Sequence, residues 1–141
     1  MNVLFICTGN TCRSPMAEAL AQQIAQQQHR DDVNVASAGL ATFEEPAAAN
    51  ALHVMSEIGC DISKHCSRPV TSELLETADI IAVMTDAHRR HLITLGVDPD
   101  RITVLGGGIP DPYGSSLENY RTTRDLLKKA VEELLSQHLP D

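Results

Sequence analysis

The chain has 141 residues, an apolar fraction of 43% and a formal net charge of −8, from 19 acidic and 11 basic residues. This length and apolar content predict one domain with its own core, residues 1–141. The acidic balance and the aromatic content of only 3% argue against a nucleic-acid partner, which requires a basic surface and stacking side chains. No signal segment or membrane-spanning run is evident, and the four cysteines do not resemble a disulfide framework, so we expect a cytoplasmic protein with no membrane partner.

Short apolar runs alternate with longer helical patterns along the chain. The alternation predicts an α/β fold in three layers, with a parallel sheet flanked by helices on both faces. Ser115 and Glu118 form a capping box before the last helix. The expected strands are residues 2–6, 33–36, 80–83 and 102–105, and the expected helices are residues 15–28, 46–58, 72–78, 86–95 and 116–138.

The loop after the first predicted strand has the composition of a phosphate cradle that contains a nucleophile. A cysteine and an arginine separated by five residues let the backbone N–H groups between them turn inward around phosphoryl oxygens. The arginine adds a planar bidentate fork for two of these oxygens. We therefore expect the loop to bind phosphate or another oxyanion. It consists of Cys7, Thr8, Gly9, Asn10, Thr11, Cys12, Arg13 and Ser14.

Local features of the loop support this interpretation. Gly9 tolerates the positive φ that a tight anion nest requires, and Asn10 also enters the left-handed region. Ser14 followed by Pro15 predicts an N-cap and the first helical position, so the loop opens into a helix N-terminus, which favours anions. The same field favours the thiolate form of Cys7, the form that attacks phosphorus.

The alternative is that Cys7 and Cys12 are ordinary buried residues and Arg13 is a surface charge. A cysteine and an arginine at this spacing are by themselves a weak pattern. The alternative leaves unexplained why the glycine, the Ser-Pro pair and the preceding strand coincide with them.

A strand followed by Cys-Thr-Gly-Asn-Thr-Cys-Arg-Ser-Pro-Met-Ala-Glu, with a later Asp-Pro-Tyr-Gly, resembles the low-molecular-weight protein tyrosine phosphatase family. The similarity covers nearly the whole chain, and Ser37, His65, Arg68 and Asp111 lie in the family's order at about its spacing. The resemblance implies a sheet of four strands in the order 2-1-3-4, with the Cys7 loop at the switch point between strands one and three. It also implies a monomer without cofactor or metal.

The same resemblance assigns roles to individual residues. Cys7 attacks phosphorus and forms a phosphocysteine, Arg13 binds two phosphoryl oxygens, and Asp111 is the general acid and then the general base. Ser14 donates to the Cys7 sulfur. The residues expected to hold the loop from behind are Asn10, Ser37, His65 and Arg68, and those expected to bind substrate are Thr8, Gly9, Asn10, Thr11, Cys12, Ser14 and Tyr113.

Thr11 is the most informative position for the substrate. Members directed at tyrosine typically carry isoleucine there, whereas threonine resembles the protein arginine phosphatase branch of the family. Tyr113 departs from that branch, which often has phenylalanine at this position. We expect a protein phosphatase that hydrolyses phosphoarginine. The alternative is a phosphotyrosine phosphatase, in which Thr11 would be a near-isosteric replacement of isoleucine. A further hypothesis is that the acidic surface around the loop attracts phosphoryl groups that have basic residues beside them.

Other readings remain open at this point. Cys12 either traps an oxidised Cys7 as a reversible disulfide, as in the family, or is a small buried residue. An arsenate reductase would need resolving cysteines near the end of the third strand, where residues 82–88 contain none. A phosphoprotein-binding module without turnover would not need both Cys7 and Asp111. We expect His88 and His91 to be solvated surface residues and not metal ligands.

Overall fold

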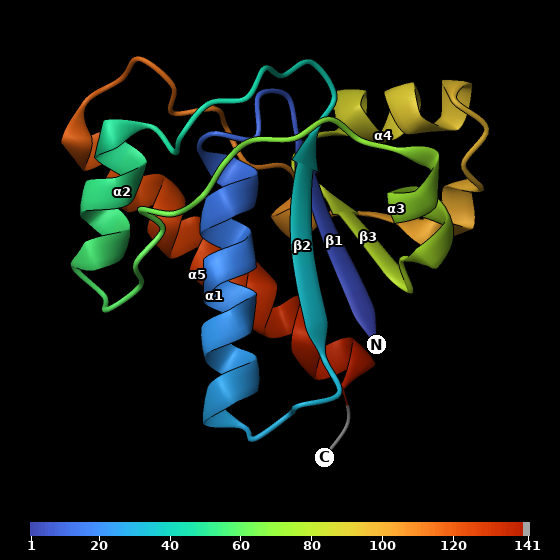
Figure 1. Cartoon of the computed structure of the whole chain (residues 1–141), viewed down its shortest axis with the longest axis horizontal. Helices are drawn as coiled ribbons and strands as arrows, with labels where there is room; N and C mark the ends of the chain where they lie inside the picture. The colour runs from blue at the N-terminus through green and yellow to red at the C-terminus, as the bar shows by residue number, and fades with distance from the viewer. Residues whose placement is uncertain (140–141) are drawn as a thin grey trace.

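The parallel sheet has four strands in the order β2-β1-β3-β4 (Figure 1). The computed structural model describes residues 1–139, so Pro140 and Asp141 of the predicted domain lie outside the described residues. Fold class and strand order are as expected and are confirmed. The strands are β1 (Asn2–Cys7), β2 (Asn34–Gly39), β3 (Ile80–Val83) and β4 (Ile102–Val104).

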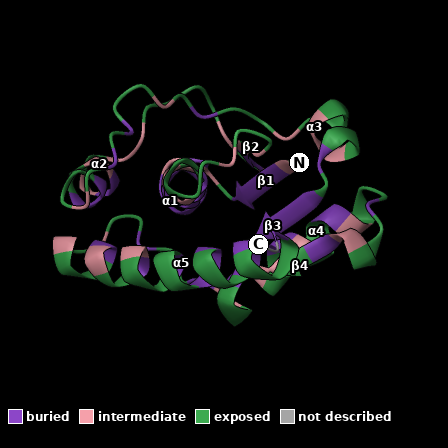
Figure 2. Ribbon diagram, turned by 90° about the horizontal axis from the view of Figure 1, so that it is seen from below, coloured by how far each residue is buried: buried purple, intermediate pink, exposed green. Residues whose placement is uncertain are grey.

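Helices cover both faces of the sheet and give it three layers (Figure 2). Helices α1 and α5 pack on one face, with α2 against α5, and α3 and α4 lie on the other face. The helices are α1 (Arg13–Gln27), α2 (Ala49–Ser56), α3 (Ser72–Thr77), α4 (Asp86–Thr94) and α5 (Leu117–His138), with short 3-10 helices η1 (Pro99–Arg101) and η2 (Leu105–Gly107) around β4.

The central strand β1 is apolar along its buried length because both of its faces are covered. Val3, Phe5 and Cys7 enter the core beneath α1 and α5. Leu4 and Ile6 enter the second core, beneath α4. This alternation of side chains along the strand directs Cys7, the last residue of β1, toward the layer from which α1 begins.

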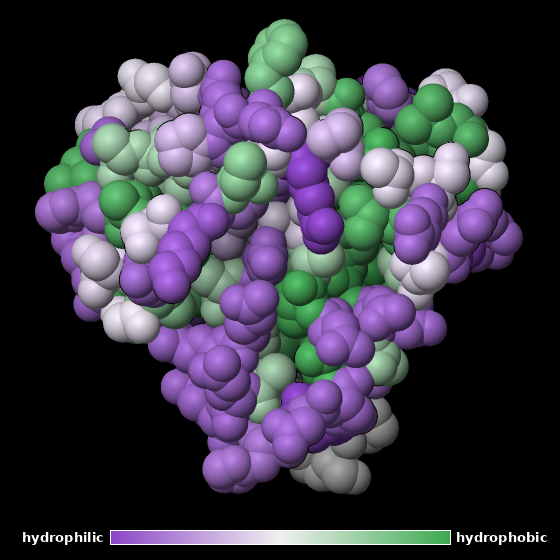
Figure 3. All heavy atoms as spheres, viewed as in Figure 1, coloured by the Kyte–Doolittle hydropathy of each residue, from purple (hydrophilic) through white to green (hydrophobic). Residues whose placement is uncertain are grey.

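The outer strand β2 leaves part of the sheet open to solvent. Figure 3 shows apolar side chains gathered between the hydrophilic surface of α1 and the region of α3. A shallow groove there is lined by Val35, Ala36 and Leu74 among others. This groove lies at the opposite end of the strands from Cys7, since its other lining residues include Asn2 and Asn34.

Two predicted helix caps are wrong. Helix α1 begins at Arg13, two residues earlier than expected, with Cys12 and not Ser14 as its N-cap. The Ser14 hydroxyl instead contacts the Cys7 sulfur and Asn10, so it is not available to cap the helix. At α5 the cap is Ser116, whose Oγ accepts the Asn119 N–H, one residue later than expected.

The first part of the helix predicted for residues 46–58 is also absent. Pro46 pairs with Cys66 in an isolated bridge, and the Ala48 N–H donates to the Thr11 carbonyl at 2.9 Å. These contacts hold residues 46–48 in an extended conformation, so α2 begins only at Ala49. The segment therefore forms part of the wall around the Cys7 loop.

The end of β2 approaches this loop closely. A Cβ atom on Gly39 would lie 2.8 Å from the Thr8 carbonyl oxygen and 3.0 Å from Cβ of Asn10. Both neighbours belong to the loop backbone or to a buried side chain, so neither can move aside at low cost. Only glycine allows this packing.

Gly39→Ala is expected to lower the free energy of unfolding by about 1–3 kcal/mol, because the added methyl group overpacks the contact with Thr8 and Asn10. Chemical denaturation followed by circular dichroism measures this. Gly9→Ala is the control: its Cβ would meet nothing nearer than 3.6 Å, so its stability should stay close to that of the wild type. Equal stability of the two variants would contradict the packing argument.

Candidate active site

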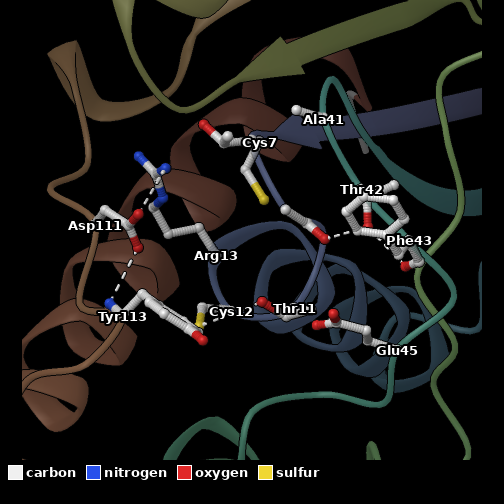
Figure 4. Close-up of a pocket in the computed structure, with 12 residues that line it drawn as sticks. Cys7, Thr11, Cys12, Arg13, Ala41, Thr42, Phe43, Glu45, Asp111 and Tyr113 are labelled. Carbon is white, nitrogen blue, oxygen red and sulfur yellow. Dashed lines mark hydrogen bonds and ion pairs between the residues drawn. The ribbon is translucent and has the colours of Figure 1, made fainter.

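A pocket of about 210 Å³ opens at the end of β1, above the N-terminus of α1 (Figure 4). The Cys7 loop forms its floor, the segment after β2 forms one wall, and the loop before α5 forms the other. Its lining residues are Cys7, Thr8, Gly9, Thr11, Cys12, Arg13, Ala41, Thr42, Phe43, Glu45, Asp111 and Tyr113.

The Cys7 sulfur lies at the bottom of this pocket and is almost fully buried. Its Sγ lies 2.9 Å from Ser14 Oγ, and the Asn10 backbone N–H donates to it at 3.2 Å. Hydrogen-bond donors at a sulfur stabilise negative charge on it. This environment therefore suits a sulfur that attacks and later leaves as an anion.

Asn10 connects the loop to three other parts of the chain and is completely buried. Its Nδ2 donates to Ser14 Oγ at 2.7 Å and to Ser37 Oγ at 3.0 Å, while its Oδ1 accepts the Arg68 N–H at 3.0 Å. The Asn10 carbonyl lies 2.7 Å from Nε2 of His65. The structure thus brings together the four residues expected behind the loop and supplies each polar atom of Asn10 with a partner.

The left-handed position in the loop is Asn10 and not Gly9, which corrects the expected role of the glycine. Asn10 has φ of 55°, whereas Gly9 does not have a positive φ. The five side-chain and backbone contacts of Asn10 hold it in this unfavourable region. Gly9 instead accepts a hydrogen bond on its carbonyl from Thr42 Oγ1 at 2.6 Å, which joins the loop to the wall of the pocket.

Arg13 and Asp111 face one another across the pocket (Figure 4). Arg13 is buried, and its Nη1 donates to the Ile109 carbonyl at 2.9 Å, while its Nη2 lies 3.6 Å from Asp111 Oδ2. The Asp111 side chain is 51% exposed, and its Oδ1 accepts the Tyr113 N–H at 3.0 Å. A buried guanidinium therefore lies within the pocket that holds the sulfur, and a carboxyl group faces it from the mouth.

Of the residues expected to bind substrate, Thr8, Gly9, Thr11, Cys12 and Tyr113 line the pocket, whereas Asn10 and Ser14 are buried behind it. Tyr113 is 71% exposed at the rim. Cys12 is buried, and its Sγ lies 3.3 Å from the Tyr120 hydroxyl. Burial raises the pKa of the Cys12 thiol above its usual value. All four cysteines of the chain are free thiols in the structure.

Several contributors were not expected from the sequence. Glu18 accepts a hydrogen bond from Ser37 Oγ at 2.5 Å, and Phe43 and Glu45 line the pocket from the segment after β2. Glu18 is the last residue of the motif at residues 7–18, so the motif itself pointed to it. Phe43 and Glu45 lie in an irregular segment without any motif. The expectation of a solvated His88 is wrong: it is only 6% exposed and contacts Thr8.

Two further properties concern the described residues as a set. Within residues 1–139, no three His, Cys, Asp or Glu side chains converge so that they could hold a metal ion. In the same range, no helix has both the length and the apolar character that crossing a membrane requires.

Comparison with known proteins places the chain in a family. The model of the family described as low molecular weight phosphotyrosine protein phosphatase matches residues 2–140. The chain is 38% identical to a protein-arginine-phosphatase of Bacillus subtilis (strain 168), over 97% of this chain and 96% of that one. It is 33% identical to an arsenate reductase of Staphylococcus aureus (strain Newman), over 96% of both.

Solved structures agree with the sequence relatives. A crystal structure of a YwlE mutant from Bacillus subtilis superimposes with a TM-score of 0.92 at 36% identity, over 98% of both chains. A low molecular weight protein tyrosine phosphatase from T. tengcongensis gives a TM-score of 0.93 at 36% identity, over 97% of this chain and 99% of that one. The family expected from the loop motif is confirmed. The chain belongs to the low molecular weight phosphotyrosine protein phosphatase family.

Proposed function

We propose that this protein is a protein phosphatase that hydrolyses phosphoarginine on proteins through a phosphocysteine intermediate. The observation that carries the proposal is the arrangement of one pocket: the buried Cys7 sulfur at its floor, Arg13 beside it, and Asp111 at its mouth. The likeness to a Bacillus subtilis protein-arginine-phosphatase supports it. The partners are then phosphorylated proteins, with inorganic phosphate as a product that binds in the loop, and the protein acts as a cytoplasmic monomer without a cofactor.

In the first step the Cys7 thiolate attacks the phosphorus, and an S–P bond forms as the bond from phosphorus to the leaving nitrogen breaks. Loop N–H groups and the Arg13 fork bind the three phosphoryl oxygens, where charge develops in the transition state. The Asp111 carboxyl donates a proton to the leaving nitrogen, so that the arginine side chain departs as a guanidinium.

In the second step a water molecule attacks the phosphocysteine and Asp111 accepts its proton. The S–P bond breaks, and the electron pair returns to the Cys7 sulfur. Ser14 Oγ at 2.9 Å and the Asn10 N–H at 3.2 Å stabilise this leaving thiolate. Phosphate then leaves the loop, and the enzyme is restored.

The lining of the pocket supports an arginine-derived substrate over a tyrosine-derived one. Thr11 presents a hydroxyl, and the Glu45 carboxylate lines the same pocket. A guanidinium can donate to both groups, whereas the ring of phosphotyrosine offers them no donor. The aromatic residues Phe43 and Tyr113 can stack on either group and do not distinguish between the two substrates.

An arsenate reductase cycle receives less support from the structure. Among the described cysteines, only Cys7 and Cys12 line the pocket. Cys60 lines a separate cavity beside α2, and Cys66 is exposed in the segment that pairs with Pro46.

The substrate is tested with matched phosphoarginine and phosphotyrosine peptides, using kcat/KM for the wild type and Thr11→Ile, with Cys7→Ser as the blank. We expect the wild type to favour phosphoarginine and Thr11→Ile to shift the preference toward phosphotyrosine, because isoleucine replaces a polar contact with an apolar surface for the ring. A wild type that prefers phosphotyrosine makes this a tyrosine phosphatase. Turnover of neither peptide overturns the phosphatase proposal.

Asp111→Asn and Asp111→Ala should lower kcat by about 10²- to 10⁴-fold, because neither side chain can transfer a proton to the leaving group. Competitive inhibition by inorganic phosphate should change by less than about threefold, since Arg13 and the loop still bind it. Asp31→Asn, an exposed substitution in the turn between α1 and β2, serves as the control. Near-normal kcat in both Asp111 variants would rule out the proposed role.

Glu45→Gln should reduce kcat/KM for the phosphoarginine peptide by roughly two- to fivefold, the effect of one exposed ion pair, and leave the phosphotyrosine peptide unaffected. The neighbouring Glu44→Gln is a matched control, because Glu44 does not line the pocket. Equal losses in the two variants would show that only the overall charge matters, and no loss in either would remove Glu45 from substrate recognition.

A further inference from the structure

His88 lies in the first turn of α4 and contacts the phosphate loop from the opposite layer of the fold. Its Nε2 is 2.8 Å from Thr8 Oγ1, and the side chain is almost completely buried. The His88 backbone N–H donates to Thr85 Oγ1, the N-cap of α4, at 3.2 Å. The start of the helix is therefore fixed, and the ring has a defined position against the loop.

The His88 ring is neutral near pH 7 and has one N–H to donate. Burial, reinforced by the nearby positive charge of Arg13, lowers the pKa of His88 to about 4, although Asp111 acts in the opposite direction. Among the described residues, Nδ1 is buried without a hydrogen-bond partner. An unpaired buried N–H is rarer than an unused acceptor, so the hydrogen belongs on Nε2, which then donates to Thr8 Oγ1.

Thr8 directly follows the nucleophile, so its orientation sets the first peptide unit of the cradle. Its carbonyl accepts the Ala41 N–H at 2.9 Å, and the Cys7 carbonyl accepts the Leu40 N–H at 3.0 Å. These two bonds fix the peptide from the side of β2. The bond to His88 fixes the Thr8 side chain from the side of α4, a layer that the Asn10 contacts do not reach.

We propose that His88 is a positioning residue for the phosphate loop. It acts through Thr8, holding this residue so that the cradle keeps the shape that binds phosphoryl oxygens, and it does not contact the substrate. The expected effect of His88 on turnover rests on the proposed function. The expected effect of His88 on the binding of inorganic phosphate does not depend on which phosphorylated residue is the substrate.

The test compares His88→Leu, Thr8→Val and the double variant. Calorimetric titration with inorganic phosphate gives the affinity, and peptide hydrolysis gives kcat and KM separately. Each single variant should lose about tenfold in phosphate affinity, because each removes the same hydrogen bond. The double variant should be no worse than either one, since the two residues act as one unit. His88→Gln, which keeps an amide donor, should recover most of the loss.

His91→Gln is the matched control, one turn further along the exposed side of α4, and should bind phosphate as the wild type does. The proposal would be overturned if the losses of phosphate affinity in the two single variants multiplied in the double variant. Unchanged phosphate affinity in His88→Leu, with only a lower melting temperature, would also overturn it and leave His88 a purely structural residue. If His88→Leu does not fold, a comparison of Thr8→Ser with Thr8→Val tests the same hydrogen bond between residues 8 and 88. Only the valine variant, which lacks a hydroxyl, should lose phosphate affinity.

The two proposals can fail separately. A wild type that hydrolyses neither peptide but shows the expected phosphate affinities refutes the phosphatase proposal and supports the role of His88. Normal phosphoarginine turnover with no effect of His88 or Thr8 on phosphate affinity refutes the role of His88 alone.

Discussion

The active-site loop depends on one buried asparagine in a left-handed conformation. Asn10 has φ of 55°, which a residue with a side chain adopts only at a cost, and it is completely buried. Its amide is bonded to Ser14, Ser37 and Arg68. Because the polar atoms are satisfied, the network stabilises the loop, and loss of one partner leaves a buried group that costs about 1–3 kcal/mol. The position of the Cys7 sulfur depends on this network, since both groups that contact the sulfur, Ser14 Oγ and the Asn10 N–H, belong to it.

Electrostatic interactions complete the site at its mouth. Arg13 is buried within a protein that carries a net charge of −8, and the Ile109 carbonyl and Asp111 compensate its charge. The Ile109 backbone is in turn held by its N–H, which donates to the Met84 carbonyl at the end of β3 at 2.7 Å. The arginine and the carboxyl group therefore have fixed positions relative to the sheet, as a reaction that needs both groups at one phosphorus requires.

The sequence predicted the features that are local in the chain. The strands, the loop and the start of α1 within two residues followed from apolar runs and from residues 7–14, whereas the strand order came from the family resemblance. Contacts between distant segments were harder to predict. His88 was expected in solvent because no carboxylate or cysteine on the same face of the predicted helix completes a metal site with it. Helical periodicity does not show that the first turn of α4 reaches Thr8 at the carboxyl end of β1. Similarly, nothing in residues 46–48 indicates that Pro46 pairs with Cys66 in place of starting a helix.

The contacts of the phosphate loop also determine when the site can form. The loop occupies positions 7–14, whereas its partners lie at positions 37, 65, 68, 88 and 109. Such long-range contacts close late in folding, because each requires the chain between its ends to be ordered first. On the ribosome, the cysteine emerges before all of these partners, and they must follow before its surroundings are available. A nascent or truncated chain therefore carries the thiol without the environment that makes it a phosphate-directed nucleophile.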